Sequence, residues 1–464
     1  MKAKRLVSIA LILCLIAGLT VPAAAKKTCN CGHDPVVYVH GFGTNLYQLG
    51  EGEAERIYPP KSEKYKEQAL TIAGAVLALL LRQYRLFADL GMKAAGELLG
   101  AIACDPSGEV GEGTGIRSAS MPSSDVHGKM QEGNADYTFS YDWRLSPLDN
   151  AELLHKYVER VKALCGHSKV SLVCHSMGGT VLASYLYLYG SEDVSRMVAL
   201  APAWQGLSIM GSLLSGEADI ADKGEQLDMF LQSVPTISNK WLKAMIRIAG
   251  MTGVYPYILR FLQGALDDQF ERVFDEFLLG LFGTMPGIWA FVPDKYFAGA
   301  KAFSFGDDPK YDALRAKVDR YHDEVQNHLT DLLRSATDGG MQLVILSGYG
   351  ISSMPLSRAH TVQSDVLIDT CFSSIGGTGA DFGKTLSSGT ILSPDKTVDA
   401  GTCAFPAETW FVRGMMHFDF PKQTVEFVRW AVEQPSQPTF ETSAQYPQFV
   451  LWDAEANAIV PEVK

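Results

Sequence analysis

One serine stands where a buried strand would turn sharply into a helix. The segment Cys174–Gly179 reads Cys-His-Ser-Met-Gly-Gly, follows the predicted strand Val170–Val173 and precedes the helical pattern Thr180–Tyr189. Such a turn lifts a serine hydroxyl clear of the backbone, and small neighbours let strand and helix approach closely. Cys174 stands where the usual Gly-x-Ser-x-Gly pattern has its first glycine, but it is small. We therefore predict that Ser176 is a nucleophile rather than an ordinary serine in a turn.

A glycine loop upstream could stabilise the charge that forms when this serine attacks a carbonyl. His40–Gly43 reads His-Gly-Phe-Gly and follows the strand-like run Val36–Val39. Backbone N–H groups stabilise such an oxyanion, and the usual donors are the amide after the His-Gly pair and the amide after the nucleophile. These rules predict an oxyanion hole built from the N–H groups of Phe42 and Met177.

A general base must follow the serine in the chain, because the expected order is nucleophile, acid, base. The histidines after Ser176 are His322, His328, His360 and His417. His417 follows the strand-like run Trp410–Arg413 and precedes a helical pattern, where the loop of a base belongs. We predict that His417 is the base, with a purely structural role as the alternative. His175 is expected to point away from the site and to pack.

The acid that orients the base should lie one strand earlier. Asp395 is our choice, because it lies 22 positions before His417, which leaves room for one helix or loop and one strand. Its role would be to hold the imidazole tautomer. Asp381 and Asp399 are the alternatives in the same glycine-rich region.

Strands alternate with helices along most of the chain, which predicts an α/β fold with a mostly parallel sheet covered by helices on both faces. The predicted strands are Val36–Val39, Tyr137–Tyr141, Val170–Val173, Val194–Leu200, Met341–Leu346 and Trp410–Arg413. Residues 26–205 would form the first part of the core, with a helical insertion at about 60–105. Residues 206–335 are helical and predict a cap inserted between strands. Residues 336–464 would complete the core and carry a C-terminal tail.

The first 25 residues have the pattern of a cleaved secretory signal peptide. Lys2, Lys4 and Arg5 precede an apolar run, and small residues around Ala23-x-Ala25 follow it. A retained N-terminal anchor is the alternative. The full chain has 40 basic and 52 acidic residues, so nucleic acid is not an expected partner. We expect a secreted, acidic protein.

A secreted protein can form disulfide bonds between its cysteines. Seven of the eight would remain after cleavage, an odd number that leaves at least one thiol unpaired within the chain. Cys371 and Cys403 are plausible partners across the loops that flank Asp395. Cys29-x-Cys31 is too isolated for a zinc site. We predict no metal and no organic cofactor.

Several islands of sequence resemble one family. Tyr141–Arg144 reads Tyr-Asp-Trp-Arg and resembles a signature of the lecithin–cholesterol acyltransferase and lysosomal phospholipase A2 family. The other islands are Ala201–Gly206, Met285–Asp294, Gly348–Gly350 and Asp395–Val398, the last with Lys396 in place of the glycine of an Asp-Gly-Thr-Val acid motif. The spacing to His417 also resembles bacterial secreted lipases. The resemblance implies an α/β-hydrolase fold and acyl-ester chemistry; from the residues alone, Asp142 and Arg144 are expected to form an ion pair that braces a loop.

Together these features predict a secreted serine hydrolase that cleaves carboxylic esters of lipid-like substrates through an acyl-enzyme. An O-acyltransferase using the same intermediate is one alternative, a peptidase or amidase on the same scaffold is another, and a non-catalytic lipid-binding protein is a third. The apolar cap would select the substrate, or simply pack on the sheet, and Trp204 is a candidate for the pocket wall. The expected partners are a lipid or ester substrate and a transient lipid interface; the oligomeric state stays open.

Overall fold

A computed structural model describes residues 32–50, 54–117, 121–128, 135–220, 250, 255–354, 362–443, 445–453 and 455–462. The predicted signal peptide, residues 1–25, lies outside these residues, as do residues 221–249 of the predicted helical cap. Within the described ranges, no helix is long and apolar enough to span a bilayer.

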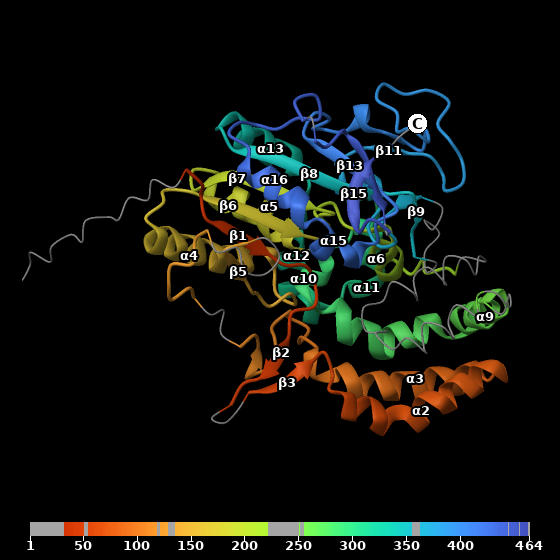
Figure 1. The fold of residues 1–464 in the computed structure, drawn as a ribbon. Helices are drawn as coiled ribbons and strands as arrows, with labels where there is room; N and C mark the ends of the chain where they lie inside the picture. Colours follow the sequence, from red (N-terminus) through yellow and green to blue (C-terminus); the bar gives the residue numbers. More distant parts are fainter. Residues whose placement is uncertain are drawn as a thin grey trace, which may run out of the picture.

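An eight-stranded sheet forms the centre of the molecule, in the order β15-β14-β13-β8-β7-β6-β1-β5 (Figure 1). Every neighbouring pair is parallel except β14 and β15. The strands are β1 (Val36–Val39), β5 (Tyr137–Phe139), β6 (Val170–His175), β7 (Val194–Leu200), β8 (Gln342–Tyr349), β13 (Thr409–Arg413), β14 (Phe449–Asp453) and β15 (Ala458–Pro461). The prediction of an α/β-hydrolase fold with a mostly parallel sheet is confirmed.

Helices cover both faces of this sheet. Successive side chains of a strand point to opposite faces, and the apolar side chains on each face pack against helices. On one face, residues such as Leu172 and Cys174 pack in a core with the helices α4 (Pro147–Cys165), α5 (Gly178–Tyr189) and α13 (Leu329–Asp338). On the other face, residues such as Val173 pack in a core with α15 (Phe420–Gln423) and α16 (Val425–Glu433). Strands buried on both sides explain the continuous apolar runs in the sequence.

The helix α4 shows how local signals set element ends. It begins at Pro147, directly after Ser146. The Ser146 hydroxyl accepts a hydrogen bond from the Leu148 N–H, and proline at the first helical position loses no hydrogen bond. Gly166, in the left-handed region at φ 72°, ends the helix.

Two long insertions interrupt the alternation of sheet strands and covering helices. Between β1 and β5 lie β2 (Leu46–Gln48), β3 (Glu55–Tyr58), α2 (Ser62–Leu80), α3 (Tyr84–Leu99), the 3-10 helix Gly100–Ile102 and β4 (Thr114–Gly115). Between β7 and β8 lie α6 (Ser208–Leu214), α9 (Tyr255–Val273), the π-helix Phe274–Gly283, α10 (Pro286–Trp289), α11 (Asp294–Phe305), the 3-10 helix Pro309–Tyr311, α12 (Asp312–Tyr321), the π-helix His322–Gln326 and α13. The helices α2, α3 and α9 lie together below the body of the molecule in Figure 1.

A third excursion separates β8 from β13. It contains β9 (Ile351–Ser352), β10 (Gln363–Ser364), α14 (Thr370–Ser373), β11 (Thr378–Gly379), β12 (Val398–Asp399) and the 3-10 helix Ala400–Thr402. The 3-10 helix His417–Asp419 follows β13 directly. This arrangement brings the loop after β8 and the loop after β13 to the same edge of the sheet as the end of β6, because the carboxyl ends of parallel strands share one edge.

Candidate active site

Ser176 occupies a sharp turn between β6 and α5. Its φ is 55°, in the left-handed region that non-glycine residues rarely adopt. The turn is held by three backbone bonds: the Ser176 N–H donates to the Leu200 carbonyl at 3.1 Å, and its own carbonyl accepts from the N–H groups of Gly179 (3.0 Å) and Ala203 (2.9 Å). The predicted strand–turn–helix context of Ser176 is therefore present.

The small residues of the motif are needed where the turn crosses β1. A side chain at Gly178 would overlap the backbone carbonyl of Val39, which explains why glycine begins α5. Cys174 is fully buried among the core residues of the sheet, and burial raises the pKa of its thiol. Its side chain packs between the strand and the helices, so the missing first glycine does not disturb the turn.

A hydrogen-bonded chain links Ser176, His417 and Asp365. His417 Nε2 lies 2.9 Å from Ser176 Oγ, and His417 Nδ1 lies 2.8 Å from Asp365 Oδ2. An ionised carboxylate only accepts, so Nδ1 carries the proton and Nε2 of the neutral ring accepts from the serine hydroxyl. The three groups are almost completely buried. The structure thus brings the two predicted residues, Ser176 and His417, into contact.

Asp365 is fixed by the turn that carries it. Its Oδ1 accepts hydrogen bonds from the N–H groups of Leu367 (3.0 Å) and Ile368 (2.7 Å), which leaves Oδ2 for the imidazole. The Asp365 carbonyl also accepts from the His417 N–H at 2.9 Å. Val366 has φ 83°, an unfavourable value for a β-branched residue. The strained turn therefore holds the carboxylate in one orientation.

The prediction that Asp395 contacts His417 is wrong. Asp395 Oδ1 accepts from Ser393 Oγ, Thr397 N and Thr397 Oγ1, and its Oδ2 lies 3.3 Å from Arg413 Nε. The Asp-x-Thr pattern builds a local turn in which Lys396 takes φ 59°, at the position where the family motif has glycine.

The two alternative acids are also engaged elsewhere. Asp381 pairs with Lys384, and Asp399 accepts from the N–H groups of Thr390, Ile391 and Gly401. Sequence reasoning missed Asp365 because Asp395 has a suitable spacing to His417 and also matches a family motif. Asp365 is the first acidic residue after β8, and that simple signal would have favoured it.

The glycine loop lies directly against the nucleophile. A Cβ atom placed on Gly41 would come within 2.8 Å of Ser176 Cβ, so glycine is needed for this approach. In the part of the chain that the structure describes, the N–H groups of Phe42 and Met177 donate to no protein acceptor. Two free donors beside the serine are what the predicted oxyanion hole requires.

Tyr141–Arg144 braces that loop. The Tyr141 hydroxyl donates to the His40 carbonyl at 2.9 Å, and Trp143 Nε1 donates to the Thr44 carbonyl at 3.1 Å. Arg144 and Asp142 form a buried two-point ion pair, with Nε–Oδ1 at 2.9 Å and Nη2–Oδ2 at 2.7 Å. The residues therefore act as the predicted loop brace.

His175 lies next to the nucleophile but turns toward the base. Its Nε2 donates to the His417 carbonyl at 3.1 Å, and the centroids of the two rings are 4.7 Å apart. Burial, reinforced by the nearby His417, lowers the pKa of His175 well below its ordinary value. A neutral His175 therefore links the nucleophile turn to the loop of the base.

Trp204 lies in the core rather than at an open surface. It is 1% exposed, and its Nε1 donates to the Phe372 carbonyl at 3.2 Å. A nearby pocket of about 390 Å³ is lined by Gln205, Thr330, Cys371, Phe372, Ile375, Gly376, Thr402 and Ala404. The role of Trp204 as a wall for substrate stays a prediction.

The predicted bridge between Cys371 and Cys403 is not formed. Both are free thiols, and burial raises the pKa of each to about 12. Cys165 is also free, with its Sγ 3.1 Å from the Tyr137 hydroxyl. Cys403 packs in a small core cluster, whereas Cys371 is half-buried and lines the pocket near Trp204.

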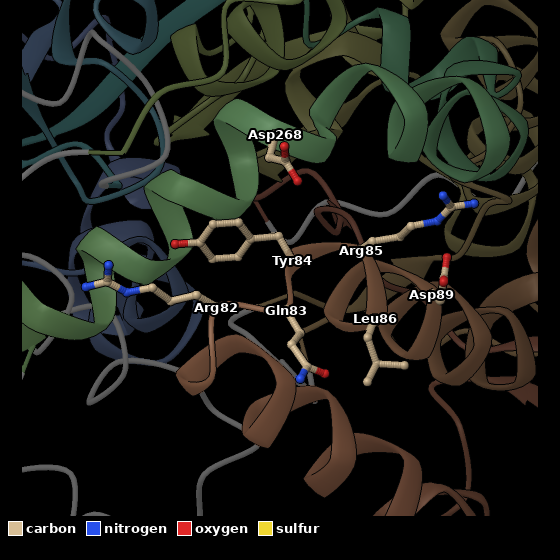
Figure 2. A pocket seen from close by; sticks show the side chains of 7 residues that line it. All are labelled: Arg82, Gln83, Tyr84, Arg85, Leu86, Asp89 and Asp268. Carbon is tan, nitrogen blue, oxygen red and sulfur yellow. The ribbon is translucent and has the colours of Figure 1, made fainter.

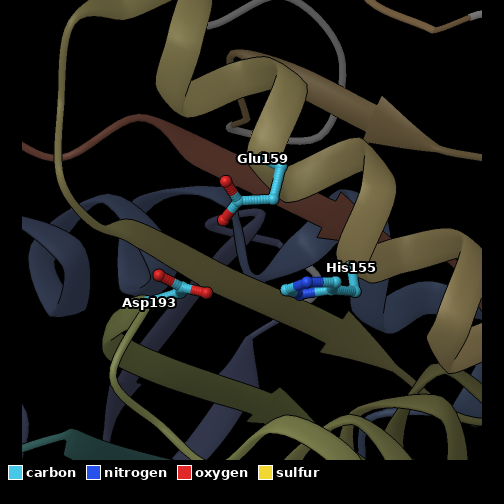
Figure 3. A group of neighbouring side chains, drawn as sticks. All are labelled: His155, Glu159 and Asp193. Atoms are coloured by element: carbon cyan, nitrogen blue, oxygen red, sulfur yellow. The ribbon is translucent and has the colours of Figure 1, made fainter.

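One cluster has ligand types suited to a metal ion. His155 and Glu159 of α4 and Asp193 before β7 face one another (Figure 3), with potential ligand atoms within 4.8 Å. The Lys162 ammonium, however, already contacts the carboxylates of both Glu159 and Asp193. This cation offsets the negative charge, and we assign no metal centre there.

Comparison with known families supports the resemblance seen in the sequence. Residues 130–232 match the family model described as lecithin:cholesterol acyltransferase. The matched segment contains both the Tyr-Asp-Trp-Arg brace and the Ser176 turn. In general terms, this match supports a lipid-acting hydrolase or acyltransferase that works through an acyl-enzyme.

Other comparisons add little to this lecithin:cholesterol acyltransferase match. No curated protein matches the chain significantly. A solved structure titled "The crystal structure of Tle4-Tli4 complex" is similar at 18% identity with a TM-score of 0.20, over 39% of this chain. The match spans 47% of that structure's chain, about half its length. This low structural similarity carries no functional argument.

Proposed function

We propose that the protein is a secreted serine hydrolase that cleaves carboxylic ester bonds of lipids. The observation that carries the proposal is the hydrogen-bonded chain from Ser176 through His417 to Asp365, next to the N–H groups of Phe42 and Met177, which donate to no acceptor among the described residues. Nucleophile, base and orienting acid within hydrogen-bond distance are the arrangement needed for acyl transfer to a serine.

In the proposed reaction, the Ser176 hydroxyl gives its proton to His417 Nε2 as its oxygen attacks the ester carbonyl. The N–H groups of Phe42 and Met177 bind the oxyanion. Asp365 stabilises the imidazolium, which then protonates the leaving alcohol. Water, activated by the same His417, releases the acid and regenerates the serine.

The surroundings of the oxyanion loop support an apolar substrate. Phe42 is 42% exposed, and its ring lies 4.3 Å from that of Trp143, 6.3 Å from that of Tyr58 and 6.5 Å from that of Phe291, centroid to centroid. An exposed Phe42 ring backed by buried aromatic side chains, beside the reacting carbonyl, favours an acyl chain over a charged peptide.

Transfer of the acyl group to a lipid alcohol is the second candidate, because the matched family model is described by that activity. It uses the same acyl-enzyme and differs only in the acceptor. Comparing free fatty acid with new ester product, at fixed water content and added long-chain alcohol, separates the two reactions.

The main test is active-site labelling. A fluorescent alkyl phosphonate should label the wild-type protein and fail to label Ser176→Ala, whose fold is checked by circular dichroism. If folded wild-type protein is not labelled, the hydrolase proposal is wrong and the lipid-binding alternative gains support. p-Nitrophenyl esters of increasing chain length, beside phospholipid and triglyceride emulsions, then test the substrate class, and a preference for acetate would reject the lipase assignment.

Secretion is a separate part of the proposal, based on the pattern of residues 1–25. Expression of the full chain should yield a mature protein that begins near Lys26, as read by N-terminal sequencing. Recovery of the intact N-terminus on the protein would reject it.

A further inference from the structure

The hairpin of β14 and β15 brings a buried carboxylate to the strands that lead into the proposed active site. These two strands extend the sheet beyond β13 (Figure 1), and Glu462 directly follows β15. The Glu462 side chain is only 5% exposed. Burying a carboxylate is costly unless hydrogen-bond donors and cations surround it. The groups that Glu462 contacts therefore indicate what its burial achieves.

Glu462 is bound by donors from two different strands. Its Oε1 accepts from Arg413 Nη1 at 2.8 Å, and its Oε2 accepts from the Tyr349 hydroxyl. Tyr349 is fully buried, and burial together with the neighbouring carboxylate raises the pKa of its hydroxyl above the ordinary value. The hydroxyl therefore keeps its proton and donates it. One carboxylate thus links the end of β8 to the end of β13.

The two donors are neighbours across the sheet. Tyr349 and Arg413 are the last residues of β8 and β13, and they lie opposite one another in the register of the two strands. The Gly414 N–H donates to the Tyr349 carbonyl at 2.9 Å. The stem of Arg413 packs on Gly350, where a Cβ atom would come within 2.7 Å of Arg413 Cγ. The contacts of Glu462 therefore join the two strands at the point where each enters its loop.

These two loops carry the proposed acid and base. Gly414 begins the loop that reaches His417 three residues later. In the other loop, the Gly350 N–H donates to Gln363 Oε1 at 3.0 Å, and Gln363 lies two residues before Asp365. The His417 N–H in turn donates to the Asp365 carbonyl. A relative shift of the ends of β8 and β13 would therefore move the acid against the base.

Asp395 holds the other side of the same guanidinium. Its Oδ2 lies 3.3 Å from Arg413 Nε, and the Arg413 side chain is 42% exposed. An ion pair that is open to water contributes little, because solvent screens it. Glu462 is shielded from water and engages both of its oxygens, so it is the partner that fixes Arg413, and Asp395 supports it.

Charged side chains elsewhere lack this shielding. Figure 2 shows a pocket of about 450 Å³ at the turn between α2 and α3, where Arg82, Arg85, Asp89 and Asp268 are exposed. Water and salt weaken the interactions of such groups. Hydrogen bonds to a buried carboxylate are stronger, because the local dielectric constant is lower. The bonds of Glu462 can therefore restrain β8 and β13 in a way that surface charges cannot.

We propose that Glu462 is a positioning residue that ties the ends of β8 and β13 and thereby keeps Asp365 and His417 in one relative position. It acts through the two loops and not on the substrate. A misplacement of about 1 Å can lower a catalysed rate about a hundredfold. The expected effect of losing Glu462 is therefore on kcat more than on KM. The inference rests on the proposed function.

The test compares Glu462→Ala with Ile459→Ala in the full chain, by steady-state hydrolysis of a soluble p-nitrophenyl ester. Ile459 lies on β15 and packs against the core beside α16, so its truncation loosens the same strand and leaves the polar network in place. Denaturant titrations measure the stability that each variant loses, and the assays use conditions in which both are folded. Glu462→Ala should lower kcat at least about tenfold with KM within about twofold, whereas Ile459→Ala should keep both within about twofold.

Glu462→Gln tests whether the hydrogen bonds of the side chain are what matters. Its amide oxygen can accept from Arg413 and its NH₂ group can donate to the Tyr349 oxygen, so most of the lost activity should return. A second measurement does not depend on turnover: the proton NMR signal of His417 Nδ1–H, which reports the hydrogen bond to Asp365. This signal should shift or broaden in Glu462→Ala and stay unchanged in Glu462→Gln and in the control.

The outcomes separate this inference from the proposed function. If a phosphonate labels the wild type and Glu462→Ala keeps the kcat of Ile459→Ala, the positioning role is wrong and the hydrolase proposal stands. An effect confined to KM also overturns it. If the wild type is not labelled, the proposed function is wrong, and an unchanged Nδ1–H signal in Glu462→Ala then overturns the positioning role as well.

A second variant covers the case in which Glu462→Ala does not fold. Tyr349→Phe removes one of the two bonds to Glu462 and keeps the ring, which packs against Phe411 and Phe449. Its kcat should fall about fivefold, in line with the loss of one hydrogen bond. A wild-type kcat in folded Tyr349→Phe would overturn the proposal.

Discussion

Asp365→Asn changes one oxygen of the proposed acid to an amide nitrogen and keeps its size. The carboxylate accepts three hydrogen bonds, from His417 Nδ1, Leu367 N and Ile368 N. An asparagine would keep its oxygen on the two backbone N–H groups and turn its NH₂ group toward His417. Because Nδ1 would then have to accept, the proton moves to Nε2 and the ring can no longer take a proton from Ser176.

The size of the effect follows from this tautomer change. In a serine protease with the same arrangement, the corresponding substitution lowers kcat by about 10⁴ while leaving the geometry intact. We expect a similar loss here, about 5 kcal/mol in the activation free energy. The fold should survive, because the side chain is isosteric and the two backbone bonds remain.

The assay is steady-state hydrolysis of a soluble p-nitrophenyl ester by wild type, Asp365→Asn and Asp395→Asn. The Asp395 variant loses a half-exposed ion pair to Arg413 and should keep activity within about threefold, with a stability change of at most about 1 kcal/mol. If Asp395→Asn loses activity by thousands-fold while Asp365→Asn stays near wild type, the geometry of the site has been misread.

Two further predictions concern buried ionisable side chains. Arg144→Met leaves Asp142 without its partner in the core, so the free energy of unfolding in denaturant titrations should fall by about 3–5 kcal/mol; a loss below about 1 kcal/mol would contradict the bracing role. Because burial lowers the pKa of His175, the unfolded chain binds more protons than the folded protein below about pH 6.5, so stability is fully present above that pH and falls as the pH drops. His175→Gln keeps a donor for the His417 carbonyl and should retain activity while flattening the decline of Tm between about pH 6.5 and 5; an unchanged slope would exclude His175 as its source.

Local patterns predicted those parts of the site that depend on neighbouring residues in the chain. A strand that is followed at once by a helix, with small residues between them, forms a tight turn, and this local pattern identifies Ser176. The small residues are needed because a side chain at Gly178 would overlap β1. His417 could also be predicted from the sequence, because the base is expected after the last strand that precedes the closing helix. The strands β1 and β7 have the predicted bounds, and all but one residue of each strand is buried.

The acid could not be assigned by a local pattern. Asp365 and His417 are 52 residues apart, and a chain excursion with several short elements lies between them. Within it, Asp395 matches a familiar motif, but its carboxylate bonds to residues next to it in the chain. Asp365 reaches His417 because the fold brings the loops after β8 and β13 together at one edge of the sheet. The same limit applies to Cys371 and Cys403, whose pairing was guessed from their position in the chain.

The sequence by itself determined that a serine and a histidine at the ends of two strands could perform nucleophilic chemistry, because a strand, a turn and a helix restrict one another within a few residues. Only the tertiary structure decided which carboxylate completes the pair, that Tyr141–Arg144 braces the oxyanion loop, and that Glu462 links the ends of β8 and β13. Each of these depends on which segments, far apart in the chain, pack side by side, and that is set by the burial of whole elements rather than by the residues next to each site.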